Sequence, residues 1–369
     1  MKRKVEAPGG QPWSQPQIYE IRFKGHLSSY RAQVFEGLEM VTGPAGETVL
    51  TGPVTDQAAL HGILSRIRDL GVPLLSVKRL ATDEPNTDSA PSPTTLLNSY
   101  THHLHSAILQ DDLKVSVSLP HSYYHQPGQV FPVLYVLDAD LFFGLVTDMT
   151  RLMHMDGACP EIIVVGIGYP LQELYGSEFK RFIVRRHHDF SPVADPTVER
   201  ELESWLHLDR VPTGGARLFL QVIEQELLPM VEAEYRACPG DRTLLGHSAG
   251  GMFALYTLWQ EPRFFQRFVV GSPPLGWGEE ALFTLESDYA REHDSLPARV
   301  FLGIGREEET NATPLGALVS VSAFYRFSTV MGHRQYKELA LTSKVFEGQT
   351  HCTVVAPLFL EGIRHVFAS

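Results

Sequence analysis

The hydrophobic positions in the first eighty residues follow the period of strands and then the period of a helix. Segments 18–23, 33–40 and 47–51 alternate between apolar and polar residues, which predicts strands, and residues 43–46 (G-P-A-G) predict a turn between the last two. An apolar face at helical spacing follows, made of Leu60, Ile63, Leu64, Ile67 and Leu70. The pattern predicts a small α+β module over residues 17–80.

The boundaries of this helix are marked by capping and breaking residues. Thr55 is predicted as its N-cap with Asp56 in the first turn, and Gly71 and Pro73 end it before a final strand at 74–77. The resulting ββ(β)αβ module carries no paired acid and base and no nucleophile near a base. We therefore interpret it as an interaction or dimerisation module through which the chain forms a homo-oligomer, with a passive solubilising appendage as the alternative.

Two stretches lack the apolar residues that a folded core requires. Residues 1–16 are rich in Pro, Gly and Gln and are predicted to be a disordered tail. Residues 81–96 are rich in Pro, Ser, Thr and acidic residues and are predicted to be a linker. The domain boundary is placed in that linker, and a second domain is expected over 97–369.

From residue 97 onward the pattern changes to strands that alternate with helices. Several segments read as strands, some of them apolar on both faces as buried parallel strands are: 98–107, 113–119, 131–138, 162–167 and 300–304. A helical stripe over 216–236 lies between them, with Leu218, Val222, Leu227, Leu228 and Val231 on its apolar side. The pattern predicts an open, mostly parallel α/β sheet with helices on both faces.

A turn that carries a serine follows one of these strands. Residues 246–251 read G-H-S-A-G-G, after the apolar run 243–245 and before the apolar, helix-forming segment 252–256. G-x-S-x-G is a weak motif by itself, but a strand before it and a helix after it indicate a nucleophile elbow. Ser248 is the predicted nucleophile. The backbone N–H of Ala249, at the start of the helix, is the predicted oxyanion donor.

A serine nucleophile needs a base, and His351 is the predicted one. It lies in a polar, glycine-containing loop between a strand-like run at 339–346 and a C-terminal apolar helix. In α/β-hydrolases the order along the chain is Ser, then Asp or Glu, then His, which His351 satisfies. His333 and His365 fall at a helix end and inside a helix, where packing or the helix dipole explains them.

The acid and the second oxyanion donor are predicted from their places after strands. Glu308 is the favoured acid among the glutamates that follow the strand ending at Gly305, with Glu307 as the alternative and a dyad without a close acid also open. The second donor is a backbone N–H just after Asp138, with Ala139, Asp140 and Leu141 as candidates.

Composition excludes several other classes of function. The formal net charge is −12, which gives no electrostatic support for a nucleic-acid partner. Three widely spaced cysteines do not form a disulfide framework. The basic start (M-K-R-K-V) has no apolar segment after it, and no run is long enough to cross a bilayer. We expect a cytoplasmic enzyme without a membrane anchor.

A cluster of histidines at 102–105 (H-H-L-H) has the alternation that places ligands on one face of a strand. No Asp, Glu or Cys lies close enough in the sequence to complete a ligand set. An exposed edge strand is therefore the preferred interpretation, and no metal site is predicted.

Several separated motifs in 97–369 resemble the esterase family that includes the enterochelin and ferric-siderophore esterases. They are V-S-L-P at 117–120, V-L-Y-V-L-D at 133–138, R-H-H-D-F-S-P at 186–192, the elbow, G-S-P-P-L-G-W at 271–277, G-R-E-E at 305–308 and E-G-Q-T-H at 347–351. The resemblance implies an α/β-hydrolase fold, with Ser248 and His351 as nucleophile and base and Glu308 as the acid. It also implies that Arg186, Asp189 and Trp277 lie near the substrate.

The chain departs from that family in two places. Ala139 stands where a glycine is usual, and the first module does not look like the sandwich domain that precedes some siderophore esterases. Residues 50–62 instead resemble small bacterial proteins of unassigned role.

These observations predict a serine carboxylic-ester hydrolase that works through an acyl-enzyme and requires no metal or organic cofactor. Basic residues within 172–215 are predicted to lie on a loop near the site. They suit an anionic small-molecule ester such as a ferric catecholate, or they form a charged lid surface. The alternatives are an acyltransferase of the mycolyltransferase type and a thioesterase similar to S-formylglutathione hydrolases. A non-catalytic binding protein acting through the first module is the alternative from another class.

Overall fold

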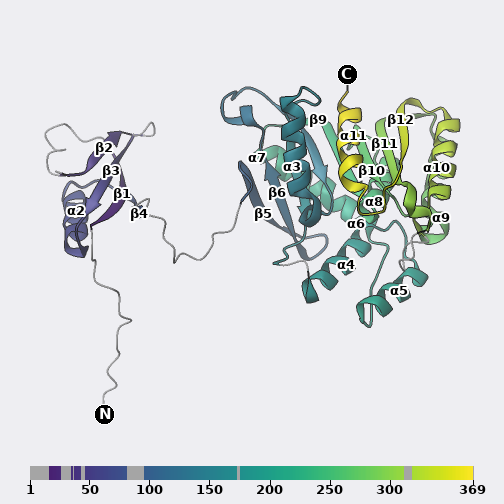
Figure 1. Cartoon of the computed structure of the whole chain (residues 1–369), viewed down its shortest axis with the longest axis horizontal. Coiled ribbons are helices and arrows are strands. Elements are labelled where there is room, and N and C mark those ends of the chain that lie inside the picture. The colour runs from purple at the N-terminus through teal and green to yellow at the C-terminus, as the bar shows by residue number, and fades with distance from the viewer. Residues whose placement is uncertain are drawn as a thin grey trace, which may run out of the picture. The chain divides into compact units, whose positions relative to one another are not determined.

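The computed structural model of the chain describes residues 16–25, 35, 37–42, 46–80, 95–172, 175–310 and 318–368. The chain divides into two compact units, Met1–Pro93 and Thr94–Ser369 (Figure 1). Nearly all of the predicted disordered tail and linker, and most of the predicted turn at 43–46, lie outside the described residues. Each unit is considered by itself below.

The first unit is an antiparallel sheet with one helix. Its elements are β1 (Gln17–Lys24), β2 (Glu39–Thr42), β3 (Glu47–Val54), α2 (Gln57–Asp69) and β4 (Leu74–Leu80), and the strand order is β2-β3-β1-β4. Its core contains Ile21 and Phe23 of β1 and Ile67 of α2, so the predicted apolar face of the helix is confirmed. The second strand lies at 39–42, at the end of the segment predicted for it, most of which is outside the described residues.

The N-cap of α2 is Asp56, and the prediction of Thr55 was wrong by one residue. The Asp56 carboxylate accepts the N–H of Ala59 at 2.7 Å. This bond satisfies one of the four amide groups that a helix leaves unpaired at its start, and it fixes where α2 begins.

The larger unit is built on an eight-stranded sheet of order β12-β11-β10-β9-β7-β8-β6-β5. The strands are β5 (Ser99–Ser106), β6 (Asp111–Ser118), β7 (Phe131–Val136), β8 (Ile163–Gly168), β9 (Ala237–His247), β10 (Arg267–Gly271), β11 (Ser295–Gly305) and β12 (Lys337–Phe346). Strands β7 to β12 are parallel to one another, whereas β6 is antiparallel to β8 and to β5. The predicted open, mostly parallel sheet is confirmed.

Helices cover both faces of this sheet. On one face, α3 (Ala139–Met155) and α11 (Val355–Phe367) pack against side chains such as Val136, Leu245 and Phe301. On the other face lie α4 (Gly176–Phe190), α5 (Pro196–Leu206), α6 (Ala216–Val222), α7 (Leu228–Glu234), α8 (Ala249–Gln260), α9 (Trp277–Glu292) and α10 (Val321–Arg334). Alternate residues of one strand therefore serve two cores, as the pleat requires.

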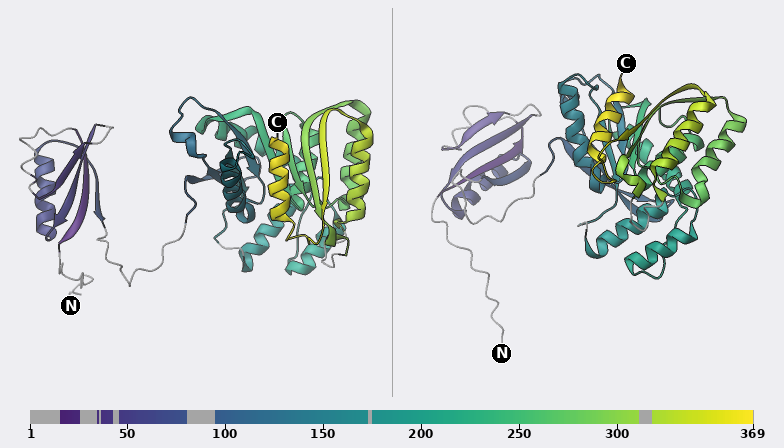
Figure 2. Two further views of the ribbon diagram at one scale, coloured as in Figure 1. Left: turned by 45° about the horizontal axis from the view of Figure 1, so that its top comes forward. Right: turned by 45° about the vertical axis from the view of Figure 1, so that its right-hand side comes forward.

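Two details differ from the sequence pattern. The helical stretch at 216–236 is α6 and α7 joined by a π-helical turn at Ile223–Leu227, and Leu218, predicted on its apolar side, is 38% exposed. The basic segment 172–215 contains the helices α4 and α5 instead of being a loop. In both views of Figure 2, α4 and α5 lie at the end of the sheet away from the C-terminus.

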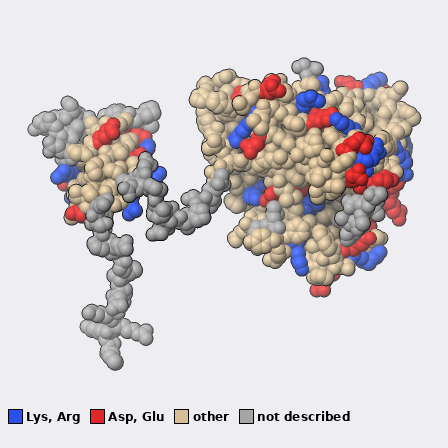
Figure 3. Space-filling view, viewed as in Figure 1, with Lys and Arg blue, Asp and Glu red and all other residues tan. Residues whose placement is uncertain are grey.

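The helices of the described residues do not include a candidate membrane span. None of these helices combines the length and the apolar character that crossing a bilayer requires. On the face of the larger unit shown in Figure 3, Lys and Arg are interspersed with Asp and Glu and do not form one basic patch.

Candidate active site

Ser248 lies on a sharp turn between β9 and α8. Its φ of +58° and ψ of −124° are strained for a residue with a side chain, and its N–H donates to the Gly271 carbonyl at 2.8 Å. Glycine is required two residues earlier, because a Cβ on Gly246 would come within 2.3 Å of the Gly250 carbonyl oxygen. The turn is thus built as an elbow, with Ser248 half-buried and its immediate neighbours buried.

His351 and Glu308 meet at the carboxyl edge of the same sheet. The Nδ1 atom of His351 lies 2.6 Å from Oε2 of Glu308. The other oxygen, Oε1, accepts the Ser272 hydroxyl and the Gly305 N–H, each at 2.7 Å. Glu308 is 1% exposed, whereas Glu307 is exposed. Of the two glutamates predicted as candidates, Glu308 is the one whose carboxylate is bonded to His351.

The imidazole of His351 lies beside the elbow. Its ring centroid is 4.6 Å from that of His247, the residue before Ser248. His247 is buried, and burial, followed by the nearby His351, holds the pKa of His247 well below its usual value. A neutral His247 therefore packs against His351. Because Nδ1 of His351 bonds to Glu308, its Nε2 is the ring nitrogen left for another partner.

Two helix N-termini lie next to each other at this edge. Ala249 is the first residue of α8 and Ala139 the first residue of α3, and β9 and β7 are paired just before them, with Leu245 opposite Val136. The Leu141 N–H donates to the Asp138 carbonyl at 2.9 Å, which removes Leu141 from the predicted oxyanion donors. The N–H groups of Ala249, Ala139 and Asp140 remain as candidates.

Asp138, which precedes α3, forms a buried ion pair with Arg186 of α4. Nε and one terminal nitrogen of Arg186 donate to the two carboxylate oxygens of Asp138 at 2.9 and 2.8 Å. Asp138 has a left-handed φ of +51°, and its Oδ2 would lie 3.3 Å from a Cβ on Gly250. The pair therefore fixes the backbone that leads into Ala139 and contacts the elbow.

The three residues predicted to contact substrate are buried in the structure. Arg186 is 7%, Asp189 4% and Trp277 1% exposed. Asp189 accepts the Tyr169 hydroxyl at 3.0 Å, and Trp277 donates to the Val193 carbonyl at 3.0 Å. The polar groups of these side chains thus bind other parts of the chain, and their place near the substrate stays a prediction.

The histidines of the 102–105 cluster lie on β5, four strands away from β9 and the elbow. Strand β5 is an edge strand, as predicted, with His102 2.6 Å from the Tyr235 hydroxyl and His105 2.8 Å from Asp112. Among the described residues, no group of three or more His, Cys, Asp or Glu side chains is arranged to hold a metal ion.

Two residues of the site were not identified from the sequence. Ser272 binds the acid, and Asp138 anchors the loop before α3. Both lie in motifs that were noted, at the ends of β10 and β7, and both have a positive φ, of +42° and +51°. Serine and aspartate are common at strand ends, so the sequence alone does not distinguish Ser272 and Asp138 from other such residues. Their roles can be recognised only when their partners, Glu308 and Arg186, are known.

Two family models match the chain. The one described as "Putative esterase" matches residues 106–349, which is more than half of the chain, and the one described as "Domain of unknown function (DUF8691)" matches residues 18–78. The two matches fall in the larger and the first unit, respectively.

Curated relatives of the chain include siderophore esterases. The ferri-bacillibactin esterase BesA of Bacillus subtilis (strain 168) is 31% identical over 190 residues, which are 50% of this chain and 62% of that protein. The siderophore triacetylfusarinine C esterase of Aspergillus fumigatus is 31% identical over 195 residues, 51% of this chain and 59% of that protein. The chain thus spans about three fifths of the length of these two relatives.

Solved structures share the fold. The BES protein from Bacillus cereus aligns with a TM-score of 0.62 at 24% identity, over 77% of this chain and 100% of that one. The siderophore hydrolase EstA from Aspergillus nidulans aligns with a TM-score of 0.63 at 21% identity, over 75% and 97%. At these identities the likeness establishes the fold, which is of the α/β-hydrolase type. The small α+β module of the first unit is given by the structure itself.

Proposed function

The chain belongs to the putative esterase family, and we propose that it hydrolyses carboxylic esters with Ser248, His351 and Glu308. The observation that carries the proposal is the 2.6 Å contact between His351 and Glu308 at the sheet edge where Ser248 lies on its strained turn. A chance glycine-rich turn would have no reason to lie beside an imidazole that a buried carboxylate orients.

In the first step, Nε2 of His351 accepts the proton of the Ser248 hydroxyl as its oxygen attacks the ester carbonyl. Glu308 holds the imidazole by Nδ1 and stabilises its positive charge. The N–H groups of Ala249 and of Ala139 or Asp140 stabilise the oxyanion, with about 3–4 kcal/mol per donor. His351 then gives its proton to the leaving alcohol, and Ser248 is left as an acyl ester.

In the second step, His351 removes a proton from water, whose oxygen attacks the acyl carbon. Collapse of the second oxyanion releases the carboxylic acid, and the proton returns from His351 to Ser248. Both donor N–H groups begin helices, so the partial positive charge of each helix end adds to the stabilisation. Apart from substrate and water, the groups named in these steps all belong to this chain.

The proposed substrates are the esters of siderophores. This proposal rests on relatives named as ferri-bacillibactin, triacetylfusarinine C and enterobactin esterases. We do not expect Arg186 to bind the negative charge of such a substrate, because Asp138 already neutralises that guanidinium. Iron, where present, would be part of the substrate.

The test compares the purified full chain with Ser248→Ala and His351→Ala on p-nitrophenyl butyrate and on enterobactin. We expect each variant to lose at least about a thousandfold in kcat, since the residues of a triad act as a unit. His333→Ala, at the exposed end of α10, is the matched histidine control and should retain activity.

The outcomes separate the competing functions. Equal rates for wild type and both variants would remove the esterase proposal and favour a binding protein. Product that forms only when an alcohol acceptor is added would replace hydrolysis by acyl transfer. Hydrolysis of the butyrate with no activity on enterobactin would keep the mechanism and reject this siderophore as substrate.

A further inference from the structure

A second pocket lies at the end of the larger sheet where β6 ends and β8 begins, opposite to the end that carries the candidate active site. It has a volume of about 430 Å³, within the range of small-molecule sites, and its lining includes residues 118–121 and 161–162. Strand β6 ends at Ser118, which pairs with Val164 at the start of the antiparallel β8. Because β8, β7 and β9 are parallel, the amino end of β8 lies away from Ser248, which follows the carboxyl end of β9.

Part of the floor and of the rim of this pocket is apolar. Leu119 and Ile162 are buried at its floor, whereas Leu97 and Met155 at its rim are 78% and 82% exposed. Large apolar side chains left in contact with water around a concave site mark a place where an apolar group binds.

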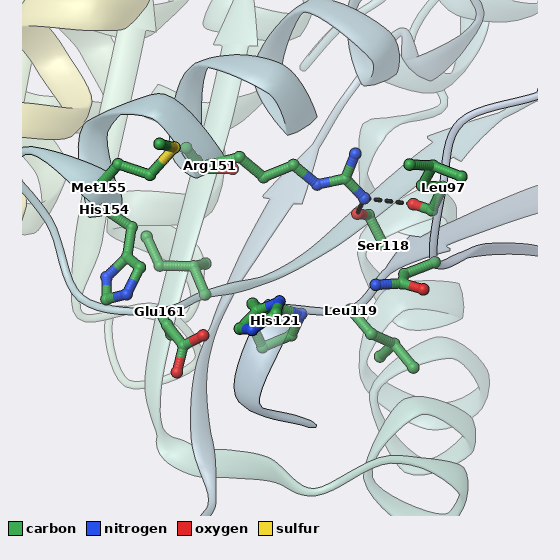
Figure 4. A pocket seen from close by; sticks show the side chains of 12 residues that line it. Leu97, Ser118, Leu119, His121, Arg151, His154, Met155 and Glu161 are labelled. Carbon is green, nitrogen blue, oxygen red and sulfur yellow. Dashed lines mark hydrogen bonds between the residues drawn. The ribbon is translucent and has the colours of Figure 1, made fainter. Parts of the chain in front are cut away.

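One end of the pocket is rich in hydrogen-bond acceptors (Figure 4). Oε1 of Glu161 accepts the Ser122 N–H at 2.9 Å, and Oε2 accepts the Ser122 hydroxyl. Burial raises the pKa of Glu161. The bonds from Ser122, followed by the nearby His154 and His121, lower this pKa by more than burial raises it, so the net shift is downward. His154 donates from Nδ1 to the Cys159 carbonyl at 3.4 Å, which leaves its Nε2 as an acceptor in the neutral ring.

The guanidinium of the pocket, that of Arg151, is already engaged. One terminal nitrogen donates to the Leu97 carbonyl and, at 3.0 Å, to the Ser118 hydroxyl, as Figure 4 shows. The other lies 3.6 Å from the Asp148 carboxylate. Helix α3 ends at Met155, so its negative end also lies at this pocket. With Arg151 engaged in this way, the groups available to a cationic head group are the negative end of α3 and the Glu161 carboxylate, whose oxygens each keep a second lone pair.

We propose that this pocket binds a small amphipathic amine. Its ammonium group lies between the Glu161 carboxylate and Nε2 of His154, and its apolar body packs on Leu119, Ile162 and Met155. The site is separate from Ser248 and does not depend on the proposed esterase activity.

The test uses three probes with one apolar body and different head groups: hexylamine, hexan-1-ol and hexanoate. Each is titrated into the full chain by isothermal calorimetry at pH 7.5. Hexylamine is expected to bind at least tenfold more tightly than the other two. Glu161→Gln is expected to weaken hexylamine by about ten- to hundredfold, the size of a lost charge-assisted hydrogen bond.

Two matched controls locate the binding. Glu292→Gln makes the same change at an exposed position at the end of α9 and should leave affinity unchanged. Met155→Trp fills the rim of the pocket and should block hexylamine, whereas Leu152→Trp, 66% exposed on the same helix and outside this pocket, should not. Because both replaced side chains are largely exposed, neither change disturbs the core.

Several outcomes would overturn the proposal. They are the absence of hexylamine binding, a preference for hexanoate, and hexylamine affinity that Glu161→Gln and Met155→Trp leave unchanged. A loss of ester hydrolysis in Ser248→Ala without any change in hexylamine affinity would show that the two sites are independent.

Discussion

Arg186 donates two hydrogen bonds to the two carboxylate oxygens of Asp138, at 2.9 and 2.8 Å, and both side chains are buried. The pair joins α4 to the backbone that enters α3, beside the turn that carries Ser248. An arginine that the sequence associates with substrate charge is thus committed to a charge within the chain.

Replacing one partner of this pair should be costly. Arg186→Met leaves the Asp138 carboxylate buried without its counter-ion, and we expect a loss of about 3–5 kcal/mol in the free energy of unfolding of the larger unit. The double variant Arg186→Met, Asp138→Leu should recover much of this loss, because no unpaired charge remains. Urea unfolding at pH 7.5 measures both, and single and double losses that simply add would contradict the coupling.

The ion pair between Arg186 and Asp138 also predicts how ester hydrolysis responds to a substitution of Arg186. Because the Arg186 guanidinium is neutralised by Asp138, Arg186→Lys should lower kcat for anionic and neutral esters by similar factors through displacement of the α3 start. A rise in KM restricted to anionic esters would instead restore substrate recognition as the role of Arg186.

Glu308 and Glu307 offer a matched test of the acid. Glu308→Gln removes the negative charge that orients His351, so kcat should fall by about a hundred- to ten-thousandfold. Glu307→Gln makes the same chemical change on the exposed neighbour and should stay within about threefold of wild type. Similar losses for both, measured on p-nitrophenyl butyrate, would argue against Glu308 as the orienting acid.

Two glycines of β9 test the packing of the elbow. An added Cβ at Gly246 would meet the Gly250 carbonyl at 2.3 Å, whereas at Gly240 it would meet nothing within 4 Å. Gly246→Ala should therefore destabilise the larger unit by about 3 kcal/mol or more, and Gly240→Ala should change its stability by less than about 1 kcal/mol. Thermal unfolding distinguishes the two, and a stable, active Gly246→Ala variant would show that the turn can relax.

Buried His187 predicts sensitivity to acid. Burial, followed by the charge of Arg186, lowers the pKa of His187 to about 3. The unfolded chain binds this proton near pH 6.5 and the folded chain does not, so this contribution to stability is present above pH 6.5 and is lost as the pH falls toward 3. The slope is at most about 1.4 kcal/mol per pH unit.

The matched variants for this prediction are His187→Phe and His333→Phe. His187→Phe keeps a ring against Trp277 and should flatten the fall in stability between pH 6 and 4. His333 is exposed, and its replacement should leave the slope unchanged. Urea unfolding at several pH values gives the slopes, and identical slopes for all three proteins would count against His187 as the source.

Because the chain divides into two compact units, we expect the larger unit to hydrolyse esters without the first one. Residues 95–369 should fold and retain kcat/KM within about twofold, because the candidate catalytic side chains and their partners all lie in that unit. Light scattering of the full and shortened chains tests the proposed role of the first unit in oligomerisation. Equal numbers of subunits in both would reject that role.

The periodicity of the sequence identified most of the strands, because burial on one or both faces leaves a local pattern in the order of residues. It did not identify the helices α3, α4, α5 and α9. The elbow could also be identified locally, since a strand, a tight turn and a helix in immediate succession impose small residues at fixed positions. The limits of α2 were less well determined, because Thr55 and Asp56 are both good caps and a single hydrogen bond distinguishes them.

Tertiary structure alone decided which charged side chains are buried at the candidate site. Three consecutive glutamates follow β11, and Glu308 is turned inward by the hydroxyl of Ser272, 36 residues before it, and by the ring of His351, 43 residues after it. Arg186 and Asp138 are 48 residues apart, and the burial of their charges depends on the packing of α4 against α8, the helix that follows the elbow. Such contacts join segments that are distant along the chain, so no local pattern of residues encodes them.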